Sequence, residues 1–197
     1  MTSDDEPRTV SDVLAERVRR YRERAELRQD DLAARTAELG HPMSRVTLAK
    51  LEAGGTRATR ATLVDVLVLA VALDVPPPLL FLPLGEAEEV AIAPGLVTHP
   101  HIALDWLAGE ESLGRHIEAW TKNQRPLQMF RGLRARQNAV HSAWNRGERP
   151  DAGPDERRQL ELALSSLSSW LDAMRSAGLT PPDMPGEWQV RMAELDA

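Results

Sequence analysis

The chain has 197 residues, of which 42% are hydrophobic and 27% charged, with a formal net charge of −6, and this composition is ordinary for a soluble globular protein. It contains no cysteine, which excludes disulfides and thiolate metal sites, and no apolar run long enough to cross a bilayer. The acidic N-terminus has no apolar segment behind it, so we expect no signal peptide, a cytoplasmic location and no membrane contact.

Charge is segregated along the chain. Residues 8–60 hold 12 basic and 8 acidic residues, and residues 115–149 hold 8 basic and 2 acidic residues. The segment between them, residues 61–114, has 8 acidic residues and neither lysine nor arginine. Basic blocks separated by acidic ones suit local contacts with phosphate groups. For the second basic block, pairing with acidic residues inside the fold is an equally good explanation.

The N-terminal part of the chain is predicted to be a short disordered tail followed by a domain of small helices. The tail covers residues 1–10 and the domain residues 11–84. Capping residues, hydrophobic periodicity and glycine or proline stops predict the helices of this domain, and a very apolar turn, LLFLP, closes it. The predicted helices cover residues 11–25, 29–39, 44–53 and 62–75. In the last of them, the residues expected to face the core are Leu63, Val66, Leu67, Ala70 and Leu73.

The third predicted helix has two chemically different faces. Ser44 is a good N-cap, and Gly54 provides a left-handed stop. Leu48 and Leu51 lie three residues apart and share the face that must be buried. Such a helix can enter the major groove of DNA if its other face is basic and polar. That other face carries Arg45, Val46, Ala49 and Lys50, with Thr47 at its edge.

The C-terminal part of the chain is also predicted to be helical. Residues 85–99 are expected to form an acidic linker with a short hairpin near 90–97, and residues 100–197 a helical region. Short helices are predicted over 102–108 and 112–123, and two longer ones follow. Glycines and prolines permit only a loop between the long helices, which should therefore form an antiparallel hairpin.

Each of the two long helices has an apolar stripe at helical spacing. The stripe of the first is Leu127, Phe130, Leu133, Val140 and Trp144. The stripe of the second is wide enough to meet either several helices or a second copy of itself, and Trp188 is expected to fold back onto this helix. The residues of this second stripe, a candidate dimer interface, are Leu160, Leu164, Leu167, Trp170, Leu171 and Met174.

Residues 11–82 resemble the Cro/C1-type (XRE-like) DNA-binding domain, which has a five-helix, lambda-repressor-like fold. The matching residues are Arg22, RQDDLA at 28–33, SRVTLAKLEAG at 44–54 and TLVDVLVLAVALDV at 62–75. The resemblance implies an ion pair between Arg22 and Glu52 that locks the first helix against the third. It also implies a phosphate contact from Gln29. The turn at residues 37–43 departs from the family because it is several residues longer than the shortest form.

The resemblance and the side-chain chemistry together give a set of candidate DNA contacts. Arg45 suits a bidentate contact to guanine, and Lys50 a base or phosphate contact one turn later. Val46 suits a thymine methyl group. Arg57 and Arg60 would hold the DNA backbone, although a purely solvated role is equally well supported for these two. The full set is Arg28, Gln29, Ser44, Arg45, Val46, Thr47, Lys50, Arg57 and Arg60.

The C-terminal region has several candidate roles. It is expected to supply the contact of a homodimer, because one helix-turn-helix domain reads only a few base pairs. Alternatively, Arg131, Arg134 and Arg136 could form an additional grip on DNA. A third role is to hold another protein, as in an antitoxin or adaptor. Binding of a small molecule among the tryptophans is a minor alternative.

Enzymatic activity, metals and cofactors are not expected. The chain has no HExxH motif, glycine-rich phosphate loop or Gly-x-Ser-x-Gly elbow. A self-cleaving Ser–Lys protease domain would depend on Lys122, in a segment predicted to be helical, and His99 and His101 lack a third metal ligand. We therefore interpret the sequence as an all-α transcriptional regulator that binds double-stranded DNA as a homodimer. The resemblance alone favours a repressor over an activator.

Overall fold

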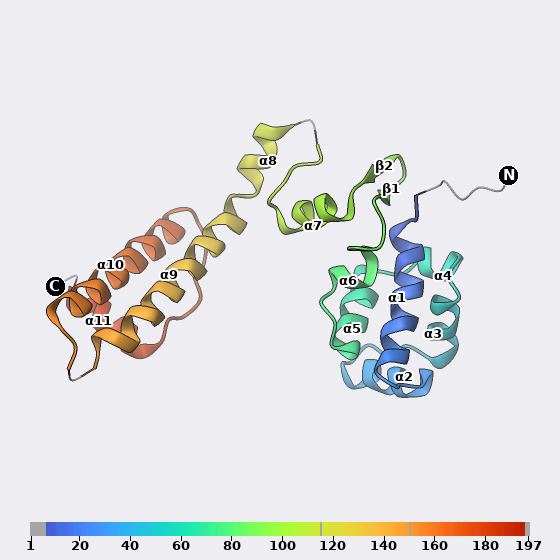
Figure 1. Cartoon of the computed structure of the whole chain (residues 1–197), viewed down its shortest axis with the longest axis horizontal. Helices are drawn as coiled ribbons and strands as arrows, with labels where there is room; N and C mark the ends of the chain where they lie inside the picture. Colours follow the sequence, from blue (N-terminus) through green and yellow to red (C-terminus); the bar gives the residue numbers. More distant parts are fainter. Residues whose placement is uncertain (1–6, 115, 150, 196–197) are drawn as a thin grey trace. The chain divides into compact units, whose positions relative to one another are not determined.

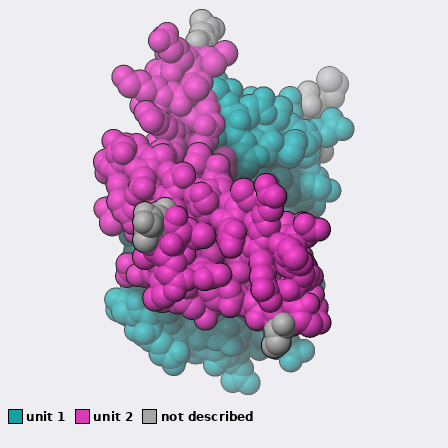
Figure 2. Space-filling view, turned by 90° about the vertical axis from the view of Figure 1, so that its left-hand side faces the viewer, with its two compact units in different colours: residues 1–113 teal, residues 114–197 magenta. Residues whose placement is uncertain are grey.

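A computed structural model divides the chain into two compact units, Met1–Leu113 (unit 1) and Gly114–Ala197 (unit 2), coloured separately in Figure 2. The structure describes residues 7–114, 116–149 and 151–195. Over these ranges it is helical apart from a two-stranded sheet and one isolated bridge, which confirms the all-α expectation. No helix in the described ranges is both long and apolar enough to cross a membrane.

The first part of unit 1 is a bundle of short helices around α1 (Figure 1). Apolar side chains from five of the helices meet in one core, and Leu14, Leu32, Leu48 and Leu69 are among its buried members. The small helical domain predicted from the sequence is therefore present. The helices are α1 (Val10–Arg24), α2 (Gln29–Glu38), α3 (Arg45–Glu52), α4 (Thr56–Thr59), α5 (Leu63–Leu73) and α6 (Pro78–Phe81).

The solvent-facing side of α5 corrects the sequence prediction. Leu63 and Leu67 were expected in the core but are 72% and 44% exposed. The residues of α5 that are buried include Leu69, Ala70 and Leu73. The helix is apolar almost all round, so hydrophobic periodicity could not decide which side would meet the core.

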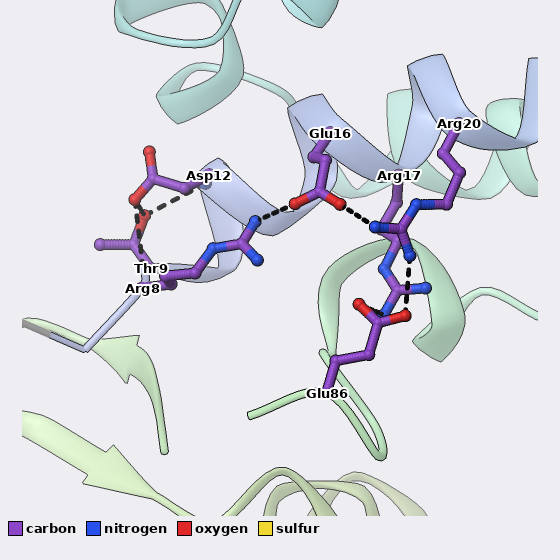
Figure 3. Close-up of polar contacts among 7 residues, drawn as sticks. All are labelled: Arg8, Thr9, Asp12, Glu16, Arg17, Arg20 and Glu86. Carbon is purple, nitrogen blue, oxygen red and sulfur yellow. Dashed lines mark hydrogen bonds and ion pairs between the residues drawn. The ribbon is translucent and has the colours of Figure 1, made fainter. Parts of the chain in front are cut away.

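The start of α1 is ordered earlier than predicted. The Thr9 hydroxyl accepts a hydrogen bond from the backbone N–H of Asp12 at 3.2 Å. The Asp12 carboxylate in turn accepts one from the Thr9 backbone N–H at 3.1 Å (Figure 3). This reciprocal capping box satisfies two amides at the helix start. The tail predicted over residues 1–10 is therefore too long, since Val10 is helical, and residues 1–6 lie outside the described residues.

The segment after α6 belongs to unit 1 and is no free linker. Strands β1 (Val90–Ala93) and β2 (Leu96–Thr98) form the expected hairpin, and α7 (Pro100–Ala108) follows. Leu82, Val90 and Ala103 are fully buried together, and the Ala91 N–H donates to the carbonyl of Arg8 at 2.9 Å. The predicted boundaries at residues 85 and 100 are thus corrected, because these long-range contacts carry unit 1 as far as Leu113.

A network of ion pairs also ties this segment to α1 (Figure 3). Glu86 accepts from Arg17 at 2.9 Å and from Arg20 at 2.7 Å, and the Arg17 side chain is only 8% exposed. Glu16 lies between Arg8 and Arg20 and pairs with both. Burial raises the pKa of Glu16, but the hydrogen bond and charge of Arg8 and the charges of Arg20 and Arg17 outweigh this and lower its pKa below the usual value.

Unit 2 is built on the predicted antiparallel hairpin of two long helices (Figure 1). Its core joins the hairpin to a third helix that was not among the predicted elements. Trp188 of this third helix is 6% exposed and lies in one core with the buried side chains of α10, as expected. Its ring also approaches Trp144 of α9, with ring centroids 6.4 Å apart. The helices are α8 (Ile117–Asn123), α9 (Arg125–Gly147), α10 (Pro154–Ser176) and α11 (Gly186–Leu195).

The apolar stripe of α10 is the core of unit 2. Leu164, Leu167 and Met174 have no exposed surface, and they pack among buried side chains of α9 and α11. The dimer interface predicted on this stripe is therefore wrong, since one chain already covers it. The stripe predicted on α9 is correct in part: Leu133 and Val140 are buried, but Leu127 and Phe130 are 50% and 43% exposed and Met129 is buried instead. The predicted interface residues in this core or packed against it are Leu160, Leu164, Leu167, Trp170, Leu171 and Met174.

Trp170 joins α10 to α9 by a close and specific packing. Its Nε1–H donates to the carbonyl of Met129 at 2.9 Å. A Cβ atom at Gly132 would lie 2.5 Å from its Cζ2 atom, so the ring occupies the space that only glycine leaves. The guanidinium of Arg136 lies 3.8 Å from the ring centroid. Arg136, a predicted DNA contact, is thus engaged inside unit 2.

Candidate nucleic-acid interface

Helix α3 is capped and anchored as its sequence predicts. The Ser44 hydroxyl accepts a hydrogen bond from the Thr47 backbone N–H at 3.1 Å, which satisfies one of the free amides of the first turn. The two hydroxyls of Ser44 and Thr47 also lie 2.9 Å apart. Leu48 and Leu51 are fully buried and hold the inner face in the core of unit 1.

The opposite face of α3 presents its cationic and short side chains to solvent. Arg45 and Lys50 are exposed, and Val46 is 62% exposed. Neither Arg45 nor Lys50 has a side-chain hydrogen bond or ion pair with any other residue that the structure describes. Both cations are therefore available to a ligand, and no intramolecular bond has to break before they bind it.

A buried ion pair locks α3 against α1. Glu52 accepts from Arg22 Nε at 2.6 Å and from a terminal nitrogen of the same guanidinium at 2.8 Å. The two side chains are 5% and 11% exposed. The hydrogen bond to Glu52 raises the pKa of Arg22, although burial acts in the opposite direction. A third Arg22 nitrogen donates to the carbonyl of Leu27 at 2.9 Å, so the guanidinium also holds the chain that enters α2.

Gln29 belongs to the same cluster. Its Nε2 donates to Glu52 at 3.0 Å, so its side chain bridges α2 and α3 in this structure. The phosphate contact that the resemblance implies for Gln29 stays a prediction, and it would use the remaining capacity of this half-buried amide.

The long turn between α2 and α3 is held in place at several points. Gly40 has a φ of 77° and ends α2. The Gly40 N–H donates to the carbonyl of Ala37 at 2.9 Å, and the His41 N–H donates to the carbonyl of Thr36 at 3.1 Å. The Thr36 hydroxyl accepts from the backbone N–H of Met43 at 3.1 Å. His41 Nε2 lies 2.8 Å from Asp65 of α5. The extra length therefore does not loosen α3.

This anchoring of the turn could not be predicted from the sequence. Thr36 is fully buried, but a threonine near a helix end carries no local signal that it will bond a residue seven positions later. The pair of His41 and Asp65 joins residues 24 positions apart, and nothing in either neighbourhood points to the other.

The remaining candidate contacts lie on segments that flank α3. Arg28 is exposed, and its backbone N–H donates to Asp31 at 2.7 Å just before α2 begins. Arg60 is exposed after α4. The side chain of Arg57 lies outside the described part of the structure. Of the candidates on the second basic block, Arg131 and Arg134 are exposed on α9, whereas Arg136 stacks on Trp170 as described above.

Comparison with known proteins defines the class of unit 1. Residues 13–80 match the family model of a helix-turn-helix domain, and this range runs from α1 into α6. No curated protein and no solved structure matches the chain. Unit 1 thus carries a helix-turn-helix domain, a type of domain that binds DNA through its second motif helix. In this chain α2 and α3 are the two helices of the motif, and α3 is the second.

Proposed function

We propose that the protein is a transcriptional regulator of the Cro/C1 type that binds double-stranded DNA in a sequence-specific way and acts as a repressor, with no enzymatic activity. The observation that carries this proposal is the outward face of α3. Its exposed cations, Arg45 and Lys50, are unpaired among the described residues, while its inner face and Glu52 fix the helix rigidly to the rest of unit 1. A rigid, capped helix with a free cationic face fits the major groove.

The proposed roles follow from side-chain geometry. Arg45, in the first turn, offers the planar fork that matches the two acceptors of guanine. Val46 is 62% exposed and suits a thymine methyl group, and Lys50 reaches a base or phosphate one turn further on. The amides at the start of α3, with the hydroxyl of Ser44, suit a backbone phosphate.

The test is a gel shift with DNA from the region flanking the protein's own gene. The double variant Arg45→Ala, Lys50→Ala is expected to lose specific binding. One bidentate base contact alone is worth about 1–3 kcal/mol, roughly a 5- to 150-fold change in affinity. The matched control is Arg24→Ala, an exposed arginine of the same unit that lies by Leu73 and Pro76 at the far end of α5. Unchanged specific binding by a folded double variant would refute the proposal, and the control should bind normally.

The repressor role needs a separate measurement. A reporter gene placed behind a promoter with the bound site should fall in expression when the wild-type chain is supplied, and the double variant should have no effect. A rise in expression would instead identify an activator.

A second function, binding of another protein through unit 2, is favoured by one observation. Ile117, Leu127 and Phe130 on α8 and α9 are 67%, 50% and 43% exposed, close in sequence to the exposed Arg131 and Arg134. The extra DNA grip and the adaptor role predict different outcomes for Arg134→Ala. If Arg134 contacts DNA, Arg134→Ala should reduce the slope of the logarithm of the affinity against the logarithm of the salt concentration by about one. An unchanged salt dependence removes the DNA role from this face and favours a protein partner.

A further inference from the structure

The solvent-facing side of α9 mixes large apolar and cationic side chains in its first turns. Leu127 and Phe130 are 50% and 43% exposed there, although Leu133 of the same helix is buried in the core of unit 2. At 3.6 residues per turn, the mixed residues fall within an arc of about 100° on the helix. We call this surface the α9 mixed face, and its residues are Leu127, Phe130, Arg131 and Arg134.

The charge around the α9 mixed face is almost entirely positive. Residues 116–147 contain six lysine or arginine residues and a single acidic one, Glu118. Arg134 forms no ion pair or side-chain hydrogen bond with any other residue in the described ranges. A single exposed leucine or a solvated arginine is ordinary, but apolar, aromatic and arginine side chains gathered on one arc are typical of a protein interface. The face thus offers apolar contact and positive charge to the same partner.

We infer that the α9 mixed face binds an acidic segment of another protein, one whose carboxylates lie on the same side as large apolar side chains. This inference names the partner of the second function proposed above and rests on that function. Carboxylates of the segment pair with Arg134, and its apolar side chains cover Leu127 and Phe130. The positive field of the surrounding residues also speeds the approach of an acidic partner.

The order of side chains around α9 argues against an anionic membrane as the partner. A helix that lies in a membrane interface inserts a continuous apolar side and keeps its cations on the opposite, polar side. On α9, helical geometry places Arg134 between Leu127 and Phe130. Inserting the two apolar side chains would therefore carry a guanidinium toward the hydrocarbon, which is unfavourable. Cations interleaved with apolar residues suit a partner whose carboxylates are interleaved in the same way.

Duplex DNA and a second copy of the chain also fit this face less well. Phosphates can pair with Arg134, but the DNA backbone has no apolar surface to cover Leu127 and Phe130. A two-fold axis through the face would bring the same residues together, and Arg134 of one copy would meet a surface that is itself cationic. An acidic, partly apolar protein segment satisfies both halves of the surface.

Fluorescence anisotropy with the full chain and two labelled helical peptides of about 18 residues, five turns, tests the inference. The acidic peptide carries leucine and glutamate on one side, and the neutral peptide has glutamine in place of every glutamate. The test variants are Leu127→Ala and Arg134→Gln. Matched controls lie on α10 of the same unit: Leu162→Ala, at a position 63% exposed, and Arg158→Gln, at an exposed arginine. Circular dichroism checks that each variant keeps its helix content.

We expect the acidic peptide to bind more tightly than the neutral one. Each test variant should weaken the acidic peptide about three- to tenfold, and neither control should change its affinity. Arg134→Gln should have no effect on the neutral peptide, because that peptide has no carboxylate to pair with the guanidinium. This dependence of one substitution on the other assigns the contact to Arg134.

Three results would overturn the inference. The two peptides may bind equally, the test variants may bind the acidic peptide as tightly as the controls do, or Leu127→Ala and Arg134→Gln may instead abolish binding to phosphatidylserine vesicles or to duplex DNA. Failure here is distinguishable from failure of the DNA-binding function. The Arg45→Ala, Lys50→Ala variant should bind the acidic peptide and lose DNA, whereas Leu127→Ala should bind DNA normally.

Discussion

The ion pair between Arg22 and Glu52 joins α1 to α3 and is nearly buried. Arg22→Met keeps most of the side chain's apolar stem but removes both hydrogen bonds to Glu52, at 2.6 and 2.8 Å. The carboxylate is 5% exposed and, among the described residues, keeps the hydrogen bond from Gln29 at 3.0 Å. Removing one partner of a buried pair costs about 3–5 kcal/mol, and because one bond remains we expect the lower end, about 3 kcal/mol.

A double-mutant cycle separates the pair from other effects of the substitution. Replacing Glu52 by Gln as well removes the unpaired charge, so the double variant should be more stable than the sum of the two single losses predicts, by about 1–2 kcal/mol. The matched control is Arg19→Met, on the same helix, whose pair with Glu23 is exposed on both sides (64% and 53%). This control should change stability little.

Urea unfolding can assign the loss to unit 1. Four of the five tryptophans, at positions 120, 144, 170 and 188, belong to unit 2, and only Trp106 belongs to unit 1. Tryptophan fluorescence therefore reports mainly on unit 2, while circular dichroism reports on the helices of both. Arg22→Met should shift the dichroism transition more than the fluorescence transition and speed hydrogen exchange in α3. A loss below 1 kcal/mol, or one equal to that of Arg19→Met, would refute the locking role.

Three further predictions concern packing and charge elsewhere. Gly132→Ala should destabilise unit 2 by about 1–2 kcal/mol, since overpacking outweighs the better helix propensity of alanine, and the fluorescence transition should report it. Glu86→Ala leaves the buried Arg17 without this partner and should cost unit 1 about 2 kcal/mol, whereas the exposed Glu88→Ala should not. The folded-state pKa of Glu16 lies below the usual 4.5, so its stabilising contribution is complete above 4.5 and is lost as the pH falls through the folded-state value. The free energy of unfolding should therefore fall less steeply with decreasing pH for Glu16→Gln than for the wild type.

The features that the sequence predicted well are those governed by neighbours within a few residues. The start of α3 at Ser44, the burial of Leu48 and Leu51, and the hairpin near residue 90 all follow from capping, spacing and turn chemistry. The outward direction of Arg45 and Lys50 then follows from helical geometry, because the inner face of the same helix is known.

The features that were missed depend on contacts between distant segments. Val90 and Ala103 share a core with Leu82, so the hairpin and α7 complete unit 1, and no local pattern indicates this. The apolar stripe on α10 indicated that its own side chains would be buried, but it did not indicate which segment would cover them. Helix α11, which begins directly after Pro185, covers part of this stripe.

Charge is distributed unevenly within unit 1. Residues 8–60, which include α3, carry 12 basic and 8 acidic residues, while residues 61–114, which include α5, carry 8 acidic residues and no lysine or arginine. The field of a polyanion such as DNA therefore attracts the α3 side and repels the segment that holds α5 and the hairpin. In the DNA-binding function proposed above, this polarity favours an approach to DNA with α3 first. The acidic net charge of the chain is thus compatible with DNA binding, because the repulsion is concentrated where no DNA contact is proposed.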